Sequence, residues 1–467
     1  MVFSSTTFLF IFLPVVFLLY IPLKHKARNI LLLLASLVFY AWGEPLFVFV
    51  MLFSILMNFL FARFIDNAEQ DKAKKVFVAI AVILNLSLLV VFKYTNFIID
   101  NINAVLGVNI DIVRISLPIG ISFFTFQAMS YIIDVYRDKT YSEKSILNVA
   151  LYISFFPQLI AGPIVKFHDI ANQIHKRDIS VDKVFSGIQR FIIGLSKKLL
   201  IANAVGEVAD KVFGLGTGEI SAGAAWIGAV CYSLQIYFDF SGYSDMAIGL
   251  AKIFGFDLKE NFNYPYISQG IKEFWRRWHI SLSTWFKEYL YIPLGGNRKG
   301  LFRTAVNMII VFFCTGIWHG AAWNFLVWGL FNGFFLLMET LNVLKPDKWP
   351  RPLRHIYTAL VFIIGFTIFR AENMAYAFGY IGQMFSGTAT EASSALLSGV
   401  MTPLMIVMLL IAIFASFPIL PKLRELSGRK ASEWLKRLGY ALSIVLLVLC
   451  VLNISASTFN PFIYFRF

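Results

Sequence analysis

The chain has 467 residues, of which 58% are hydrophobic and only 15% are charged. Soluble domains average about 25% charged residues, so this composition excludes an ordinary soluble protein and indicates a polytopic membrane protein. Long apolar runs follow one another along the whole sequence, and no polar block is large enough for a separate soluble domain. We therefore expect an all-α fold in one integral membrane domain over residues 1–467.

Basic residues exceed acidic ones, with 41 Lys and Arg against 27 Asp and Glu and a net charge of +14. In a soluble protein this surplus would suggest nucleic acid as a partner. In a membrane protein the positive-inside rule explains it, so we expect no nucleic-acid partner. Basic residues gather at 24–28 and 63–75, whereas the turn at 43–45 has none. The pattern predicts an outside N-terminus and cytoplasmic loops near 24–28, 63–75 and 137–144.

Many apolar segments approach the roughly 20 residues that a membrane span needs. They cover about 4–23, 29–42, 45–62, 76–93, 115–136, 146–163, 184–202, 220–240, 303–317, 320–340, 354–370, 400–418 and 436–454. No Lys or Arg precedes the first one, which favours a retained span over a cleaved signal peptide. Some segments are short or broken by Pro or Gly. We therefore expect about eleven spans, judged by that length, together with several partial helices.

The stretch FFPQLIAGPIVKFHD (155–169) combines two prolines and a glycine with an apolar run. Irregular backbone at membrane depth persists only where protein or a water-filled cavity surrounds it. One interpretation is therefore a re-entrant loop. An ordinary loop between two spans is the alternative.

The segment IKEFWRRWHISLSTWFKEYL (271–290) carries large apolar residues at helical spacing, together with six charged residues. This pattern predicts one amphipathic helix that lies at the membrane interface or is partly embedded. His279 lies four residues after Trp275 and three before Leu282, which places it on the apolar side of such a helix.

The run from Thr304 to Met338 carries no formal charge and has His319 near its middle. As one helix it would be about 52 Å long at 1.5 Å per residue, which exceeds the hydrocarbon core of a bilayer. The run must therefore break, and Gly316 to Gly320 is the natural place. Backbone freed at a break needs protein or a cavity around it, so we expect His319 to line a cavity.

Histidines in such settings suggest acyl transfer. Moving an acyl group from a thioester to a hydroxyl needs a base for the hydroxyl proton and a donor that stabilises the carbonyl oxygen. Neutral imidazole can act as the base near physiological pH, and a second His, Asn or Trp N–H can act as the donor.

The chain resembles the membrane-bound O-acyltransferases, specifically the bacterial AlgI-like branch that serves polysaccharide O-acetylation. The longest matching stretch is 235–300, which contains RRWHISLSTWFKEYLYIPLGG. Shorter landmarks are FYAWGEP (39–45), FPQLIAGPI (156–164), GIWHGAAWNFLVWG (316–329), FRAEN (369–373) and FIYFRF (462–467). The resemblance extends over nearly the whole chain and is weakest across 341–440.

This resemblance implies a ring of about eleven membrane helices, with short re-entrant and interfacial helices, around a central tunnel. It places the family's essential histidine at His319 and its second site position at His279. It also implies acetyl-CoA as the acyl donor and a polysaccharide, alginate or another, as the acceptor. Delivery would be completed by a separate extracytoplasmic protein of the SGNH-hydrolase type, and the chain would lie in the bacterial cytoplasmic membrane.

Other residues keep two interpretations each. Basic side chains near 276–303 could attract the phosphates of a CoA donor or could serve topology and lipid headgroups. They are Arg276, Arg277, Arg298, Lys299 and Arg303. Trp318 and Trp323 could wall a tunnel or pack in a core.

The DFSGYSD motif offers Asp239, Ser241 and Asp245, which could orient substrate or satisfy a helix end. His279 itself could be a site residue or an anchor for its helix. His25, His168, His175 and His355 lie in or beside loops and receive no role. Isolated cysteines and the lack of any Cys/His cluster predict no metal site.

Two further functions remain open. D-alanyl transfer from a carrier protein to teichoic acid would use the same histidine, so His319 does not discriminate it from acetyl transfer. A transporter of lipid-linked saccharide would show paired intramembrane charges and repeated halves, and the sequence displays neither.

Overall fold

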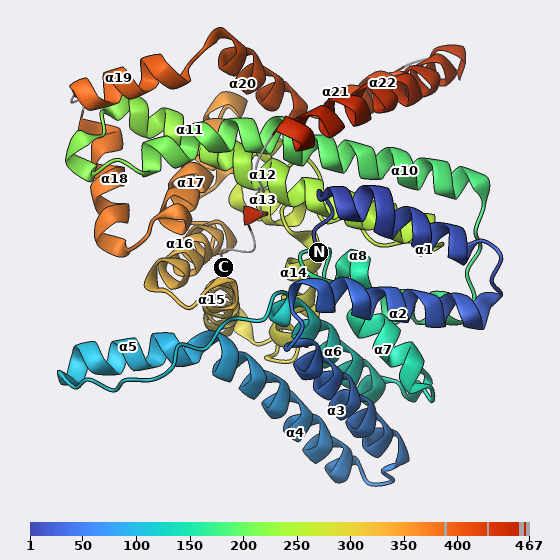
Figure 1. The fold of residues 1–467 in the computed structure, drawn as a ribbon. Coiled ribbons are helices and arrows are strands. Elements are labelled where there is room, and N and C mark those ends of the chain that lie inside the picture. Colours follow the sequence, from blue (N-terminus) through green and yellow to red (C-terminus); the bar gives the residue numbers. More distant parts are fainter. Residues whose placement is uncertain (387–389, 427–428, 457–461, 464–467) are drawn as a thin grey trace. The chain divides into compact units, whose positions relative to one another are not determined.

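The computed structural model describes residues 1–386, 390–426, 429–456 and 462–463. Every regular element within these ranges is a helix, which confirms the all-α fold class (Figure 1). The chain divides into two compact units, and each is described by itself. The first unit is Met1–Phe191 with Asp245–Lys259, and the second is Ile192–Ser244 with Glu260–Phe467. The single membrane domain expected from the sequence stays a prediction.

The first unit holds the N-terminal helices and most of α10. Its elements are η1 (Phe8–Phe12), α1 (Leu13–Tyr20), α2 (His25–Gly43), α3 (Val48–Asn67), α4 (Asp71–Leu89), η2 (Val90–Tyr94), α5 (Thr95–Leu106), α6 (Ile121–Arg137), η3 (Lys139–Tyr141), α7 (Ile146–Ser154), α8 (Phe156–Leu159), α9 (Phe167–His175) and α10 (Val181–Ser196).

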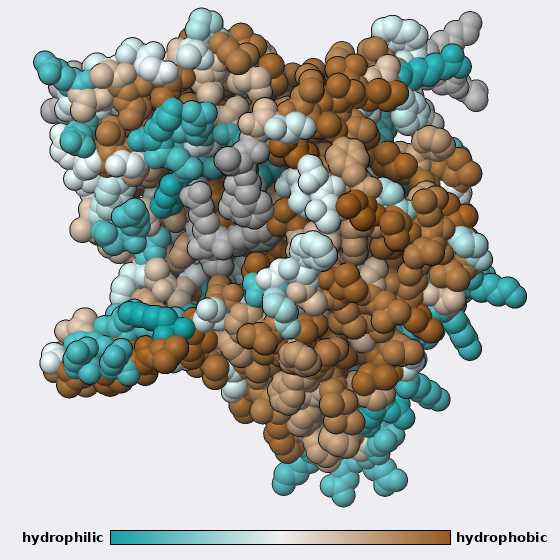
Figure 2. All heavy atoms as spheres, viewed as in Figure 1, coloured by the Kyte–Doolittle hydropathy of each residue, from teal (hydrophilic) through white to brown (hydrophobic). Residues whose placement is uncertain are grey.

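Helices α3 and α4 are joined by a pair of buried amides. Asn58 donates to Asn85 Oδ1 at 3.1 Å, and Asn85 donates back to Asn58 Oδ1 at 2.8 Å. Both side chains are fully buried, so each amide replaces the hydrogen bonds that water would have given it. Figure 2 shows apolar side chains over these two helices and hydrophilic ones at the end where they join. That hydrophilic end contains the basic loop at 63–75.

The second unit contains the remaining helices. They are η4 (Lys197–Ala202), α11 (Asn203–Phe213), η5 (Thr217–Glu219), α12 (Ala222–Ile253), η6 (Pro265–Ile267), α13 (Ile271–Arg277), α14 (Ile280–Phe286), η7 (Lys287–Tyr291), α15 (Gly300–His319), α16 (Trp323–Thr340), η8 (Pro346–Lys348), α17 (Arg351–Arg370), α18 (Met374–Ser386), α19 (Glu391–Val400), α20 (Pro403–Ala415), α21 (Ile419–Leu426) and α22 (Arg429–Ala456). The end of α12, from residue 245 to 253, belongs to the first unit.

Five helical segments in the described part of the chain are long and apolar enough to cross a membrane. A sixth qualifies if α19 and α20, bent by 80° at their junction, form one span. The five are Val48–Asn67, Asp71–Leu106, Gly300–His319, Arg351–Arg370 and Arg437–Ala456. The span expected over 4–23 is a helix at Phe8–Tyr20, which is shorter than these five. The total of about eleven spans, which rested on a length of roughly 20 residues each, stays a prediction.

The proline-rich stretch at 155–169 has little regular structure. Beyond the short helix α8, residues 160–166 form no helix, and every residue from 151 to 167 is buried. Tyr152 holds this stretch by donating to the carbonyl oxygen of Val165 at 2.8 Å. Backbone of this kind, enclosed by protein, meets the requirement for a re-entrant loop.

Glycines let α15 and α16 approach each other closely. A Cβ atom on Gly316 would lie 2.6 Å from the carbonyl oxygen of Phe325, and one on Gly329 would lie 2.9 Å from Cα of Gly316. The atoms in the way are backbone atoms, so they cannot move aside as a flexible side chain would. Small residues at a helix interface are the usual means of close packing inside membranes.

We expect Gly329→Ala to lower the free energy of unfolding by about 1–3 kcal/mol, because the added methyl group overpacks the α15–α16 interface. The measurement is the apparent Tm of the detergent-solubilised protein. Gly382→Ala is the matched control, since a Cβ at this α18 glycine meets no atom within 4 Å. Equal Tm values for the two variants would contradict the close approach.

Candidate active site

His319 is the last residue of α15, at the break that the sequence predicts. Gly320 has extended backbone (φ −168°, ψ 157°), and α16 begins three residues later at Trp323. The prediction of a break at Gly316–Gly320 is therefore confirmed, at its C-terminal edge. The His319 side chain is 6% exposed, so the protein encloses it almost completely.

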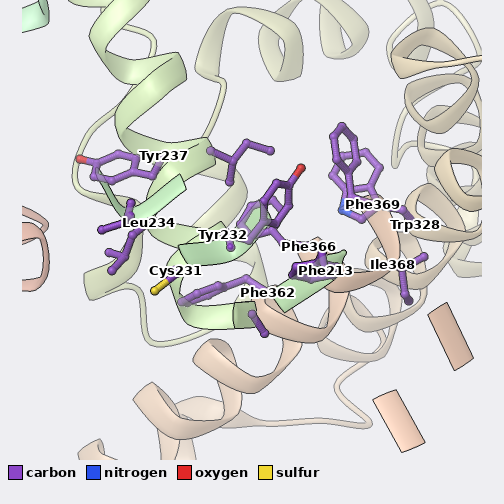
Figure 3. Close-up of a cluster of buried hydrophobic side chains, with 14 of the residues drawn as sticks. Phe213, Cys231, Tyr232, Leu234, Tyr237, Trp328, Phe362, Phe366, Ile368 and Phe369 are labelled. Atoms are coloured by element: carbon purple, nitrogen blue, oxygen red, sulfur yellow. The ribbon is translucent and has the colours of Figure 1, made fainter. Parts of the chain in front are cut away.

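Aromatic rings surround the His319 imidazole. Its ring centroid lies 5.0 Å from Trp318, 4.9 Å from Trp328 and 5.3 Å from Phe369, and all three pairs meet edge to face. Trp328 and Phe369 come from α16 and α17, and Figure 3 shows them side by side at one edge of the buried aromatic cluster. The environment of the imidazole is apolar on these sides.

His279 lies between two short helices and not within one. Helix α13 ends at Arg277, α14 begins at Ile280, and His279 has left-handed backbone with φ +43°. The single helix predicted over 271–290 is therefore wrong. The break follows from a hydrogen bond to a residue distant in the sequence, because the amide of Ile280 donates to the main-chain oxygen of Asn261 at 2.9 Å instead of continuing the helical ladder.

The two histidines meet within the second unit. Their ring centroids are 6.4 Å apart, and the Trp318 ring centroid lies 6.0 Å from that of His279. His279 is 1% exposed, and Phe240 of α12 packs against it at 4.7 Å. Residues 40 positions apart in the sequence are thus brought to one buried place, as the resemblance implied.

Asn261 holds the His279 ring and was missed by the sequence analysis. Its Oδ1 lies 3.2 Å from His279 Nδ1, 3.1 Å from the amide nitrogen of Ser281 and 2.8 Å from Ser281 Oγ. Its Nδ2 donates to Ser244 Oγ at 3.0 Å. All four side chains are buried. The asparagine within ENFNYP gave no periodic signal that could have identified it.

Glu339, also missed, fixes the start of α13. Its carboxylate accepts from the amides of Ile271 and Lys272 at 2.6 and 2.9 Å and from the Tyr357 hydroxyl at 3.1 Å. A buried carboxylate at a helix N-terminus satisfies amides that have no partner inside the helix and interacts well with the helix dipole. It thereby sets where α13, and the His279 break after it, can lie.

The basic side chains differ in their availability. Arg277 is paired with Glu273 at 2.9 Å within α13 and also donates to the main-chain oxygen of Asn263. Arg276 and Arg298 are exposed. Exposed guanidinium groups suit either phosphates or lipid headgroups, so both interpretations stay open for these two.

The acidic residues of DFSGYSD lie inside α12 and not at its end. Neither carboxylate therefore satisfies an end of α12 itself. In the second unit, Asp239 pairs with Lys198 at 2.5 Å, and its other oxygen accepts from the amide of Ile463 at 2.9 Å. In the first unit, Asp245 pairs with Arg190 at 2.7 Å. These partners give both carboxylates structural roles.

The two tryptophans near His319 and the terminal motif differ in their burial. Trp318 is buried as part of the site, whereas Trp323 is 54% exposed, so the core interpretation is wrong for Trp323. Of the terminal FIYFRF motif, Phe462 and Ile463 are buried, and residues 464–467 lie outside the described residues.

Three of the four remaining histidines have structural partners in the first unit. His168 Nδ1 lies 2.9 Å from Asp134, His175 Nε2 lies 2.7 Å from Glu143, and His25 Nε2 lies 2.8 Å from the main-chain oxygen of Ile174. The fourth, His355, is exposed on α17. Across the described ranges no group of three or more His, Cys, Asp or Glu side chains could hold a metal ion.

Comparisons with known proteins identify the family of this chain. The model of the membrane-bound O-acyltransferase family matches residues 34–375. The chain is 40% identical to the probable alginate O-acetylase AlgI of Pseudomonas putida over the full length of both proteins. It is 37% identical to the peptidoglycan O-acetyltransferase of Helicobacter pylori, over 81% of this chain and 78% of that protein.

A more distant relative is the teichoic acid D-alanyltransferase of Bacillus subtilis, which is 31% identical over 54% of this chain and 69% of that protein. The family match covers more than half of the chain, and the full-length similarity supports the AlgI-like branch. The acyltransferase prediction is confirmed, and with it the transporter alternative is set aside. The chain belongs to the membrane-bound O-acyltransferase family and is a multi-pass membrane acyltransferase.

Proposed function

We propose that this chain transfers acetyl groups from cytosolic acetyl-CoA toward an exported polysaccharide, as one integral domain of the bacterial cytoplasmic membrane. The observation that carries the proposal is the full-length similarity to proteins named alginate O-acetylase, combined with His319 and His279 at 6.4 Å. The peptidoglycan O-acetyltransferase relative supports acetylation of a cell-surface glycan more generally.

The chemistry needs few groups. The accepting hydroxyl oxygen forms a bond to the acetyl carbon, the carbon–sulfur bond of the thioester breaks, and the sulfur leaves as a thiolate. The hydroxyl proton passes to an imidazole and from there to the thiolate, so CoA leaves as a thiol. We assign the base to His319, because it lies at the break of α15 within the aromatic enclosure, and His279 is the second site residue.

We infer from the apolar runs along the sequence that this chain has no soluble part that reaches a polysaccharide away from the membrane. We propose that a separate extracytoplasmic protein of the SGNH-hydrolase type receives the acetyl group and completes the transfer. D-alanyl transfer remains the second candidate, supported by the teichoic acid D-alanyltransferase relative. That relative matches only about half of this chain, so acetyl transfer is favoured.

We expect His319→Ala to lower the initial rate of O-acetylation of the surface polysaccharide by a factor of about 10²–10⁴, because the proton acceptor is removed. The measurement is ester-linked acetate in cells with matched membrane levels of each variant. His355→Ala, on an exposed histidine, is the control and should match wild type. Wild-type acetate in His319→Ala cells would contradict the assignment. Loss of D-alanine esters instead of acetate would favour the second candidate.

We expect Arg298→Gln and Arg276→Gln to raise KM for acetyl-CoA several-fold with little change in kcat, because an exposed guanidinium attracts the phosphates of CoA before the chemical step. The same variants should leave KM for S-acetyl-pantetheine unchanged, since that thioester has no phosphate. The measurement is thiol release by membranes at low and high salt. Equal KM values for wild type and variants would show instead that these arginines serve topology or lipid headgroups.

A further inference from the structure

His279 has two ring nitrogens in different surroundings. Nδ1 lies 3.2 Å from Asn261 Oδ1 and 3.4 Å from Ser281 Oγ. Nε2 is fully buried and has no hydrogen-bond partner among the residues that the structure describes. In a neutral imidazole one nitrogen carries the proton and the other carries a lone pair, so the partners of Nδ1 determine what Nε2 can do.

The orientation of the Asn261 amide follows from its neighbours. The backbone amide of Ser281 can only donate, so the Asn261 atom 3.1 Å from it must be the oxygen. The amide nitrogen then faces Ser244 Oγ, which can accept from it at 3.0 Å. With the oxygen facing His279, the Nδ1 atom must be the donor, because two lone pairs at 3.2 Å would repel each other.

We propose that Asn261 is a positioning residue that holds His279 in the Nδ1–H form. The Nε2 lone pair is then directed toward the acyl-transfer site. His279 is then a hydrogen-bond acceptor for an O–H or S–H group of the substrates. It is not the donor that stabilises the carbonyl oxygen. This inference rests on the proposed function for the identity of the substrates, but the form of the imidazole does not depend on them.

Burial supports the neutral form. Residues 271–290 lie outside the segments that qualify as spans, and desolvation within the protein lowers the pKa of His279 to about 3. A protonated ring would place a second N–H at Nε2, where the described side chains offer no acceptor. Burial therefore favours the neutral ring, and with it the lone pair at Nε2.

Among the side chains that face His279, one other is titratable. From α15, His319 faces it at 6.4 Å together with Trp318. From α12 and the loop before α13, its ring neighbours are Phe240 and Phe262, which do not ionise. Of the charged residues in the last part of α13, Glu273 and Arg277 pair with each other, and Arg276 is exposed.

The decisive variant is Asn261→Asp. A carboxylate at this position keeps the acceptor for Nδ1 and for Ser281, but its negative charge favours the imidazolium and so raises the pKa of His279. Protonated Nε2 has no lone pair. We therefore expect Asn261→Asp to lose activity at acidic pH values at which wild type is still active, measured as CoA release from acetyl-CoA by membranes, and to recover activity as the pH rises.

Two more variants complete the comparison. Asn261→Leu removes the acceptor, and loss of a residue that orients an imidazole typically lowers activity about 10–100-fold, here at every pH. Asn263→Asp places the same new charge two positions away on an exposed residue, and its profile should overlay that of wild type. A wild-type profile for Asn261→Asp, or wild-type activity for Asn261→Leu, would overturn the proposal.

A spectroscopic measurement separates this inference from the proposed function. The ¹⁵N spectrum of protein labelled at its six histidines, in lipid bilayers and without substrate, reports which ring nitrogen is protonated. The His279 signals are identified by their loss in His279→Gln. We expect the Nδ1–H form in wild type and its loss in Asn261→Leu, whereas the Nε2–H form in wild type would overturn the proposal. If wild type shows the Nδ1–H form but does not use acetyl-CoA, the proposed function fails and the positioning role stands.

Discussion

Backbone groups that leave a helix inside a membrane protein must find hydrogen-bond partners within the protein, because lipid offers none. The second unit meets this requirement at two places, and each carries a site histidine. At His279 the interrupted ladder is completed by the main-chain oxygen of Asn261. At His319 the helix ends at an extended glycine, and the next helix packs closely enough to enclose the turn. The contacts that satisfy the backbone at these two breaks therefore also position the two histidines.

Contacts farther from the two histidines also fix the helices that carry them. Glu339 anchors the first turn of α13 from the far end of α16, and α16 in turn packs on α15 through glycines that exclude any side chain. A shift of α16 would therefore act on both histidines, through α15 and through α13. Packed helices of this kind have few alternative arrangements, which holds the two histidines within the narrow tolerance that the proposed roles in acyl transfer require.

The sequence predicted the elements whose signal is local or compositional. The break beside His319 followed from the length of an uncharged run, and both histidines were placed by their resemblance to a family. The helix over 271–290 was predicted wrongly because its apolar spacing continues through Trp278 and His279 without a proline or glycine. What interrupts it is Asn261, 18 residues earlier, and its contact pattern has no periodicity. The acidic residues of DFSGYSD likewise took partners, Lys198 and Arg190, that are distant in the sequence.

A base beside a thioester can activate either water or a sugar hydroxyl as the nucleophile. The first leads to hydrolysis of the thioester and the second to acyl transfer. The rings of Trp318, Trp328 and Phe369 leave His319 only 6% exposed, so bulk water has little access to the nitrogen that would activate it. For the proposed acetyl transfer, the exclusion of water would favour transfer to the acceptor over hydrolysis of the thioester. A cell that keeps such an enzyme in its membrane would not drain its acetyl donor by hydrolysis during periods when no acceptor is bound.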